Sequence, residues 1–324
     1  MNFIISEQPF IYKEFLMYMQ TIRGKSIGTI SEYALDLNIF FKFMCRHFKI
    51  NNSSNSIDEI DISNLDYDFL KKIQLTDIYE YLSYMNTVRK NSAATRARKV
   101  ACLRSYFKYM HSKAKYIDDN PTKELESPKL KQSLPNYLTL DESKILLETV
   151  MKNSTGARDY AIITLFLNCG MRLSELVGIN LTDIKNDTLI VTGKGNKERT
   201  LYLNNACIQA ISKYMKERPV DNVKDKNALF LSARNQRISN KTIQHLVKKY
   251  IELAGLDTKR FSTHKLRHTA ATLMYREGNT DLRTLQEILG HEQLSTTQIY
   301  THVNNEQQKK AVQNNPLANI NTSE

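Results

Sequence analysis

Three basic side chains lie close together in the segment THKLRHTAATLMYREG, residues 263–278, whose other positions suit an amphipathic helix. They are His264, Arg267 and His268. Arginine and histidine are costly to bury unless an anion or a hydrogen-bond acceptor receives them. A metal ion, a structural carboxylate and a phosphate are the candidates, and other segments of the chain distinguish them.

A metal site is the least favoured of the three. His264 and His268 have the four-residue spacing of two ligands on one helical face, but the HExxH motif of metalloproteases needs Glu where this chain has Lys265. Arg267 between the histidines would repel a cation, and no nearby carboxylate offers a third ligand. We therefore expect neither a metal nor a cofactor. His268 taken alone is also compatible with a buried structural histidine.

A phosphate suits Arg267 better, because a guanidinium is always charged and forks onto two phosphate oxygens. A second arginine, Arg172, follows a glycine in NCGMRLSELVGI, with Glu175 one turn later. Arg172 and Glu175 could form an ion pair that only stabilises the fold. The same ion pair could also orient the guanidinium toward a ligand, so the two interpretations are compatible. Lys194 in TGKGNKER lies where glycines let the backbone approach an anion, although the segment is not a Walker A loop.

Two further residues complete a series along the chain. His291 follows Gly290 in LGHEQ, and Tyr300 follows in TTQIYTHV. In chain order the candidates are Arg172, Lys194, His264, Arg267, His291 and Tyr300. This order, with the segments GMRLSEL, GKGNKER, HKLRHTAATL and LGHEQLSTTQIYTHV, resembles the tyrosine recombinase (phage integrase) family. The resemblance covers about residues 137–305, and TRARKVACLRSYFKYM resembles the core-binding domain of that family.

Within the family the chain looks most like the bacterial Xer recombinases, which have only the two domains of a C-shaped DNA clamp. The polar segment 51–70 lengthens the first domain, as in Xer variants that act without a second recombinase. The resemblance implies a tetramer that exchanges strands between two double-stranded DNA sites with inverted-repeat cores. It implies resolution of chromosome or plasmid dimers, with integration or excision of a mobile element as the alternative. An accessory DNA translocase or a second recombinase is compatible with either.

The residue types suit this reaction without reference to the family. A tyrosine that attacks the scissile phosphorus stores the bond energy of the strand in a phosphotyrosyl ester, and a phenol with a pKa of about 10 is a fair leaving group for the return step. By resemblance the product is a 3′-phosphotyrosine. Two arginines and His291 would stabilise the charge of the transition state. Lys194 would protonate the departing 5′-oxygen, and His264 would assist proton transfer from Tyr300.

Rival interpretations stay open at this stage. A type IB topoisomerase would use related chemistry as a monomer with little sequence preference. A non-catalytic architectural DNA-binding protein would bind DNA without needing Tyr300 or Arg267. A metal-dependent nuclease is a weaker rival.

Hydrophobic periodicity predicts a mainly α-helical chain with one small antiparallel β-sheet. We expect a helical core-binding domain over 1–117, a linker over 118–136 that contains three prolines, and a mixed α/β catalytic domain over 137–324. The segment DTLIVTGKGNKERTLYLN predicts a hairpin with its turn at Lys194–Lys197. Helices are expected over 9–20, 30–48, 76–85, 91–115, 139–150, 157–169, 239–255, 263–278, 282–290 and around Tyr300.

Three residues are expected to mark helix ends. Thr76 should cap the helix that follows it, Thr139 and Glu142 form a capping-box pattern, and Gly170 should end its helix. Beyond Tyr300, the segment 303–313 suits either a short amphipathic helix or a frayed C-terminus. In the family this element docks into a neighbouring protomer.

The charge of the chain points to a polyanionic partner. The formal net charge is +12, and residues 89–115 hold nine Lys or Arg and no acid. Since opposite charges three or four residues apart stabilise a helix, this acid-free stretch favours phosphate contacts. The expected contacts are Arg96, Arg98, Lys99, Arg104 and Lys108, with Lys241, Lys248 and Lys249 in the second domain.

The remaining composition is typical of a soluble protein. The four cysteines, Cys45, Cys102, Cys169 and Cys207, lie far apart with no CxxC pair, which suits a reducing compartment. No segment is long and apolar enough to cross a bilayer, and no signal-peptide core is present. We expect a cytoplasmic, nucleoid-associated enzyme that does not contact a membrane.

Overall fold

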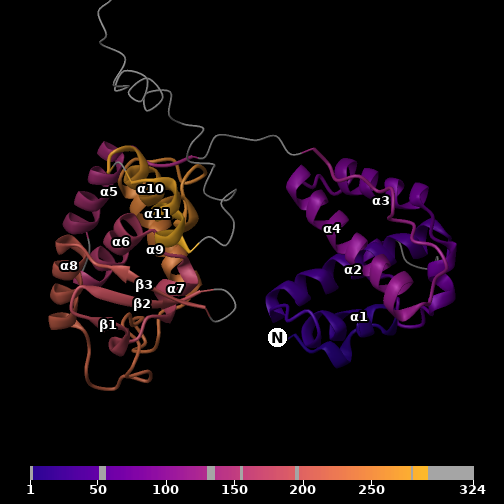
Figure 1. The fold of residues 1–324 in the computed structure, drawn as a ribbon, viewed down its shortest axis with the longest axis horizontal. Helices are drawn as coiled ribbons and strands as arrows, with labels where there is room; N and C mark the ends of the chain where they lie inside the picture. The colour runs from indigo at the N-terminus through magenta and orange to yellow at the C-terminus, as the bar shows by residue number, and fades with distance from the viewer. Residues whose placement is uncertain are drawn as a thin grey trace, which may run out of the picture. The chain divides into compact units, whose positions relative to one another are not determined.

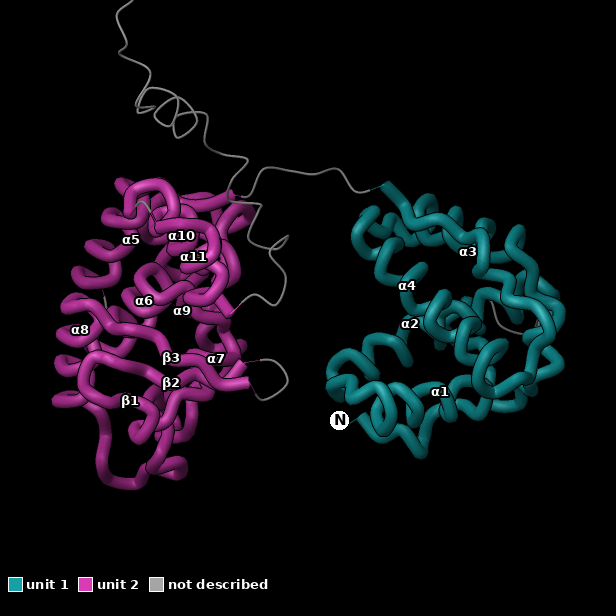
Figure 2. The backbone as a smooth tube through the Cα atoms, in the orientation of Figure 1, with its two compact units in different colours: residues 1–132 teal, residues 133–324 magenta. Residues whose placement is uncertain are grey.

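The protein is described by a computed structural model that covers residues 3–50, 56–129, 136–153, 156–193, 197–278 and 280–290. Two compact units divide the chain, residues 1–132 and 133–324 (Figure 2). Each has its own hydrophobic core. The prediction of a mainly helical chain with one small antiparallel sheet is confirmed (Figure 1). Within the described ranges, no helix is long and apolar enough to cross a membrane.

The first unit is helical throughout its described part. Its elements are η1 (Ile5–Glu7), α1 (Phe10–Thr21), α2 (Ile27–His47), η2 (Ile57–Glu59), η3 (Tyr67–Lys72), α3 (Leu75–Thr87), α4 (Ala93–Tyr109) and the π-helical turn η4 (Met110–Ala114). The α2 helix forms because Ser26 accepts the backbone N–H of Thr29 at its start. Its apolar residues, spaced three and four apart, are buried in the core of the unit.

The start of α3 differs from the prediction. Gln74 rather than Thr76 is the N-cap, and the Asp77 carboxylate accepts the backbone N–H of Gln74 at 2.8 Å. Thr76 therefore lies inside the first turn. An acid at the third helical position satisfies an otherwise unpaired N–H and favours the earlier start.

The predicted linker begins later than residue 118. Leu125 is completely buried in the core of the first unit, and Ile117 is buried beside it. The Asn120 side chain accepts the backbone N–H of Thr122 at 3.0 Å and folds this segment into a turn. Residues up to at least Leu125 thus belong to the first unit. Prolines and mixed charges do not prevent a segment from packing when it carries a leucine that a core can bury.

The second unit joins helices to a three-stranded sheet. Its helical elements are α5 (Leu140–Asn153), α6 (Ala157–Cys169), α7 (Leu173–Gly178), η5 (Leu181–Asp183), α8 (Asn205–Glu217), α9 (Asn240–Leu253), α10 (Thr263–Arg276) and α11 (Leu282–Leu289). The strands are β1 (Ile184–Lys185), β2 (Thr188–Thr192) and β3 (Glu198–Tyr202), antiparallel in the order β1-β2-β3. The strands of the predicted hairpin pair as expected, with Val191 opposite Arg199 and Leu189 opposite Leu201.

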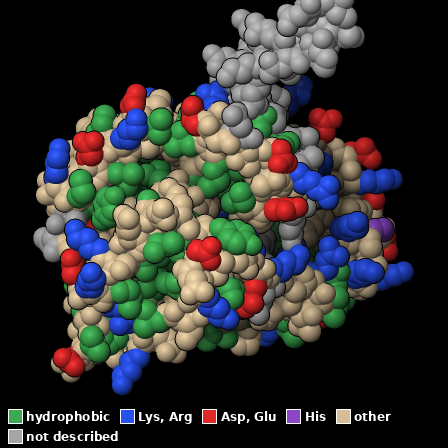
Figure 3. Space-filling view, turned by 60° about the vertical axis from the view of Figure 1, so that its left-hand side comes forward, with side chains coloured by type: hydrophobic (Ala, Val, Ile, Leu, Met, Phe, Trp, Pro, Cys, Tyr) green, Lys and Arg blue, Asp and Glu red, His purple; other side chains and the backbone are tan. Residues whose placement is uncertain are grey.

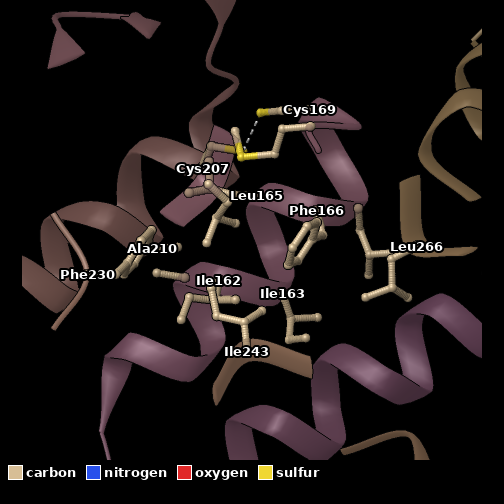
Figure 4. Close-up of a cluster of buried hydrophobic side chains, with 14 of the residues drawn as sticks. Ile162, Ile163, Leu165, Phe166, Cys169, Cys207, Ala210, Phe230, Ile243 and Leu266 are labelled. Carbon is tan, nitrogen blue, oxygen red and sulfur yellow. Dashed lines mark hydrogen bonds between the residues drawn. The ribbon is translucent and has the colours of Figure 1, made fainter. Parts of the chain in front are cut away.

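The α6 helix is the centre of this unit. It packs against α5, α8 and α10, and nine of its 13 residues are buried, in agreement with its long apolar run. Figure 4 shows side chains of α6, among them Ile162 and Phe166, packed with Leu266 of α10. The Sγ atoms of Cys169 and Cys207 lie 3.8 Å apart at the end of this core. The predicted capping box at the start of α5 is confirmed, since Thr139 and Glu142 exchange side chain–backbone hydrogen bonds of 2.7 and 3.1 Å.

Candidate active site

The turn between α6 and α7 presents Arg172. Gly170 ends α6 as predicted, with a left-handed φ of 57°. A Cβ at this position would lie 3.0 Å from Leu289 Cδ2, so both the conformation and the space require glycine. The backbone then leaves Arg172 as the N-cap of α7, with about a third of its side chain exposed.

Glu175 is the buried centre of the site. Its side chain is 0% exposed, and one carboxylate oxygen accepts the Arg172 backbone N–H at 2.7 Å while the other accepts Arg172 Nη1 at 2.8 Å. The predicted Arg172–Glu175 pair is therefore present. It holds the guanidinium at the start of α7.

A third arginine, Arg199 on β3, completes this cluster, and our sequence analysis overlooked it. Its Nη1 and Nη2 donate to the two oxygens of Glu175 at 2.6 and 2.9 Å, and its Nε donates to the Ile288 carbonyl at 3.1 Å. A sequence signal existed. Arg199 lies two residues before the buried Leu201 and hence on the inward face of the strand, where an unpaired charge is not tolerated.

Arg267 reaches the same cluster from α10. Its side chain is 4% exposed, Nη1 donates to the Gly170 carbonyl and Nη2 to the Leu289 carbonyl, both at 2.7 Å. Its Nη1 also lies 4.0 Å from a carboxylate oxygen of Glu175. The two arginines predicted from separate motifs thus converge on one carboxylate.

The end of α11 receives all three guanidinium groups. Arg199 donates to the carbonyl of Ile288, Arg267 to that of Leu289, and Arg172 to that of Gly290, the last at 3.0 Å. The final carbonyls of a helix lack partners within the helix and carry a partial negative charge. The arginines satisfy these carbonyls and are fixed by them.

The ionisation of Glu175 follows from this arrangement. Burial on its own would raise the pKa of the carboxyl, but hydrogen bonds and charge from Arg199, together with the hydrogen bonds from Arg172, outweigh it and lower the pKa to about 2. Glu175 is therefore an anion at neutral pH. Because one carboxylate faces three arginines, the cluster keeps an excess of positive charge.

His264 lies in the first turn of α10, with its side chain at the surface. Its Nε2 is 3.2 Å from Nε2 of His268, and the two rings meet edge to face. Loss of hydration and, next, the charges of Arg267, Lys265 and Arg172 lower the pKa of His264 below its ordinary 6.5. His264 is thus predominantly neutral at neutral pH and able to accept a proton. His268 is a hydrogen-bonding neighbour of His264 rather than an isolated core histidine.

The other three predicted catalytic residues lie outside the described residues. They are Lys194, His291 and Tyr300. The predicted helix over 303–313 lies outside them as well. The structure therefore brings together Arg172, His264 and Arg267.

The predicted phosphate contacts on α4 need correction at Lys99. This lysine is buried, and its Nζ lies 2.7 Å from Oδ1 of the buried Asp36 on α2. Arg98 pairs with Asp36 as well, at 2.6 Å, and with Glu32 at 3.0 Å. The acids that balance this stretch come from another helix, so the local sequence does not show them. Lys99 is a structural residue.

Other basic side chains of α4 are partly engaged. Arg96 donates to Asn86 Oδ1 and the Asn91 carbonyl, and Arg104 to Ser127 Oγ and the Leu125 carbonyl. Lys108 is exposed. The geometry therefore leaves Lys108 as the predicted α4 contact most open to a ligand.

The basic residues predicted on α9 are all exposed. Lys241, Lys248 and Lys249 lie on the surface while the apolar residues of α9 enter the core. The Nζ atom of Lys249 is 4.9 Å from the centroid of the Tyr250 ring. The face drawn in Figure 3 mixes Lys and Arg with Asp, Glu and hydrophobic side chains. This face is therefore not uniformly basic.

Comparison with known proteins gives consistent matches. Residues 136–307 match the model of the phage integrase family. The chain is 57% identical to the tyrosine recombinase XerC of Caldanaerobacter subterraneus subsp. tengcongensis, over 96% of this chain and 88% of the relative. It is 33% identical to the tyrosine recombinase XerD of Proteus mirabilis, over 92% and 90%. The crystal structure of the XerH site-specific recombinase bound to its difH substrate is similar, with a TM-score of 0.68, 27% identity, and coverage of 90% of this chain and 80% of that chain.

Proposed function

The chain belongs to the phage integrase family and is a site-specific DNA recombinase of the tyrosine type, and on this premise we propose which of its residues perform the reaction. Tyr300 is the nucleophile that attacks the scissile phosphorus. The residues that assist it are Arg172, Lys194, His264, Arg267 and His291.

The observation that carries this proposal is the convergence of Arg172 and Arg267 on Glu175. The two arginines come from motifs far apart in the sequence, yet both donate to the end of α11, the helix that leads in sequence to His291 and Tyr300. A guanidinium has five N–H groups in a planar fork that suits the oxygens of a phosphate. Arg172 keeps about a third of its side chain exposed. This positive cluster suits the charge that builds on the non-bridging oxygens in the transition state.

Proton transfers follow from the ionisation of the site. The lowered pKa of His264 keeps the ring neutral, so it can take the proton of Tyr300 as the phenol attacks. Lys194 donates a proton to the departing 5′-oxygen, and His291 donates a hydrogen bond to the phosphate. The product is a 3′-phosphotyrosine, which the 5′-hydroxyl of the partner strand attacks to restore the DNA without an energy cofactor.

The assembly in this proposal is a tetramer on two duplexes with inverted-repeat sites. Both units bind the duplex, with Lys241, Lys248, Lys249 and Lys108 on phosphates. Its role is resolution of chromosome or plasmid dimers in the cytoplasm, which the 57% identity to a XerC protein supports. A cyclic contact between protomers would close such a ring.

The test begins with selection of bound duplexes from a random-sequence library. The selected duplexes are nicked near their centres and incubated in EDTA with the full chain and with the Tyr300→Phe variant. We expect an adduct that resists SDS, that mass spectrometry of peptides locates on Tyr300, and that the variant does not form. Tight binding without an adduct on Tyr300 would refute the assignment of the nucleophile.

The same DNA distinguishes the roles. Inverted repeats that resolve tandem copies on a plasmid support dimer resolution, whereas a site that only recombines with an element end supports integration. Supercoil relaxation by a monomer without a preferred site would favour topoisomerase chemistry.

A further inference from the structure

The cluster around Glu175 raises a question of charge. Arg172 and Arg267 are the groups that the proposed function assigns to the scissile phosphate. A buried carboxylate that lies 2.8 Å from one and 4.0 Å from the other would cancel much of their positive charge. The anion needs another counter-charge if both arginines are to serve a phosphate.

Arg199 supplies this counter-charge with the best geometry in the cluster. Its contact with Glu175 is bidentate, at 2.6 and 2.9 Å, and the carboxylate is completely buried. Such paired charge-assisted hydrogen bonds are stronger than single ones. Arg172 makes only one side-chain hydrogen bond to the same group.

Arg199 is held by protein contacts at all three of its nitrogen atoms. Its side chain is 14% exposed, and Nη1, Nη2 and Nε each donate to a protein oxygen, two in Glu175 and one in the Ile288 carbonyl. These contacts tie Arg199 to Glu175 and to the end of α11, the two groups that also hold Arg172.

Arg199 also lies against the end of α11. A Cβ on Gly290 would be 3.0 Å from Arg199 Cδ, and Gly290 has a φ of 63°. The side chain thus fills the space that this glycine leaves open. The carbonyls of Ile288 and Gly290 are held by Arg199 and Arg172, so the same arginine fixes the helix end that Arg172 uses.

We propose that Arg199 is a positioning residue of this active site: it offsets the charge of Glu175 and fixes the end of α11, so that Arg172 and Arg267 are held in place and the cluster keeps net positive charge for the phosphate. The inference rests on the proposed function of those two arginines. If Arg199 has this role, the negative charge of Glu175 should slow the reaction once Arg199 is absent.

The decisive experiment compares Arg199→Met with the double variant Arg199→Met/Glu175→Gln. Both are measured for affinity to the selected duplex and for the rate of adduct formation on the nicked duplex at saturating protein. We expect Arg199→Met to bind DNA as wild type does and to form the adduct about 10- to 100-fold more slowly, the effect typical of groups that orient a reacting group. Glu175→Gln in the same chain should recover part of that loss, because it removes the uncompensated anion while a glutamine oxygen can still accept from Arg172.

A pH profile gives an independent readout. Loss of Arg199 removes the largest of the influences that lower the pKa of Glu175, so burial raises it. The carboxyl is then protonated at a higher pH than in wild type, which removes the anion. The ratio of wild-type to Arg199→Met rates should therefore fall as the pH is lowered, and no such trend should occur in the double variant.

Arg237→Met is the matched control. Arg237 pairs with Asp225 at 2.8 Å and donates to the Val177 and Ile179 carbonyls in the same unit, so it too holds α7, but through backbone carbonyls rather than through Glu175. If this variant slows the adduct as much as Arg199→Met does, or if Glu175→Gln gives no recovery, the inference is overturned. If Arg199→Met does not fold, the double variant carries the test, since it leaves no buried carboxylate without its main counter-charge. A double variant as slow as Tyr300→Phe then refutes the inference. Absence of an adduct in wild type is a separate result that refutes the proposed function.

Discussion

Lys99 and Lys108 lie on the same helix, α4, but their substitution by methionine should affect different properties, stability in one case and DNA binding in the other. Lys99 is 5% exposed in its side chain and pairs at 2.7 Å with Asp36, which is 4% exposed. Lys108 is exposed. We expect Lys99→Met to reduce the stability of the first unit with little direct effect on DNA, and Lys108→Met to weaken DNA binding alone.

The magnitude follows from what remains after the lysine is removed. Loss of one partner of a buried ion pair typically costs about 3–5 kcal/mol. Here Arg98 still contacts the other oxygen of Asp36 at 2.6 Å, with 40% of its own side chain exposed. We therefore expect the lower end, about 3 kcal/mol. Lys108→Met should change the free energy of unfolding by no more than about 0.5 kcal/mol.

Hydrogen–deuterium exchange of peptides from α2 and α4 measures this difference within the first unit of the full chain. DNA binding is measured separately, as the dependence of the logarithm of the affinity on the logarithm of the salt concentration. The steepness of this dependence should fall by about 1 for Lys108→Met and stay unchanged for Lys99→Met. The pair Asp36→Leu/Lys99→Met should recover most of the stability, because apolar replacements of a buried ion pair are usually tolerated. A stable Lys99→Met variant with a reduced salt slope would show that our assignment of Lys99 is wrong.

Three more predictions concern the second unit. Gly170→Ala should cost about 1–2 kcal/mol in urea unfolding because of its positive φ, whereas Gly28→Ala in α2, with no atom within 4 Å of the added Cβ, should be neutral or stabilising. The rate of adduct formation should fall only as the pH drops below 6.5, where His264 gains a proton. The His264→Gln variant should be slow at every pH and should not show this decrease. A wild-type rate that is independent of pH from 7 to 4 would contradict the role of His264 as the proton acceptor. The fold lowers the pKa of Glu175 from its ordinary 4.5 to about 2, so the ionised carboxylate stabilises the folded protein above pH 4.5, and this contribution is lost as the pH falls from 4.5 toward 2. In Glu175→Gln the free energy of unfolding should therefore depend less on pH over that interval. An unchanged pH dependence would count against this role of Glu175.

Local sequence signals predicted the elements that depend on a single segment. The buried face of α2, the apolar run of α6 with Gly170 at its end, and the paired strands β2 and β3 all follow from spacing and turn residues. The same rules would have found α8, which our sequence analysis overlooked. Its buried positions, Cys207, Ala210, Ile211 and Tyr214, repeat at three and four residues after the N-cap Asn204.

Interactions between distant segments could not be predicted in the same way. The acid-free run in α4 is balanced by Asp36, 63 residues from Lys99, so its charge pattern suggested a ligand where the fold supplies a partner. Glu175 could be paired with Arg172 three residues away, but its stronger contact with Arg199 crosses from α7 to β3. Spacing along the chain identifies residue types for a phosphate site. It does not identify which of them are neutralised by the protein itself.

The three arginines that meet at the end of α11 also have a consequence for protein synthesis. Arg172 and Arg199 leave the ribosome 118 and 89 residues before the carbonyls of Gly290 and Ile288 that receive them, and Arg267 precedes its acceptor Leu289 by only 22. Glu175 and the Gly170 carbonyl are made before α11, but until α11 has been made and has folded against α10, the three arginines lack their acceptors on this helix. A nascent chain can therefore fold its first unit and most of the second core before the arginine cluster is organised. The ability to cut DNA is therefore acquired only after α11 has been made.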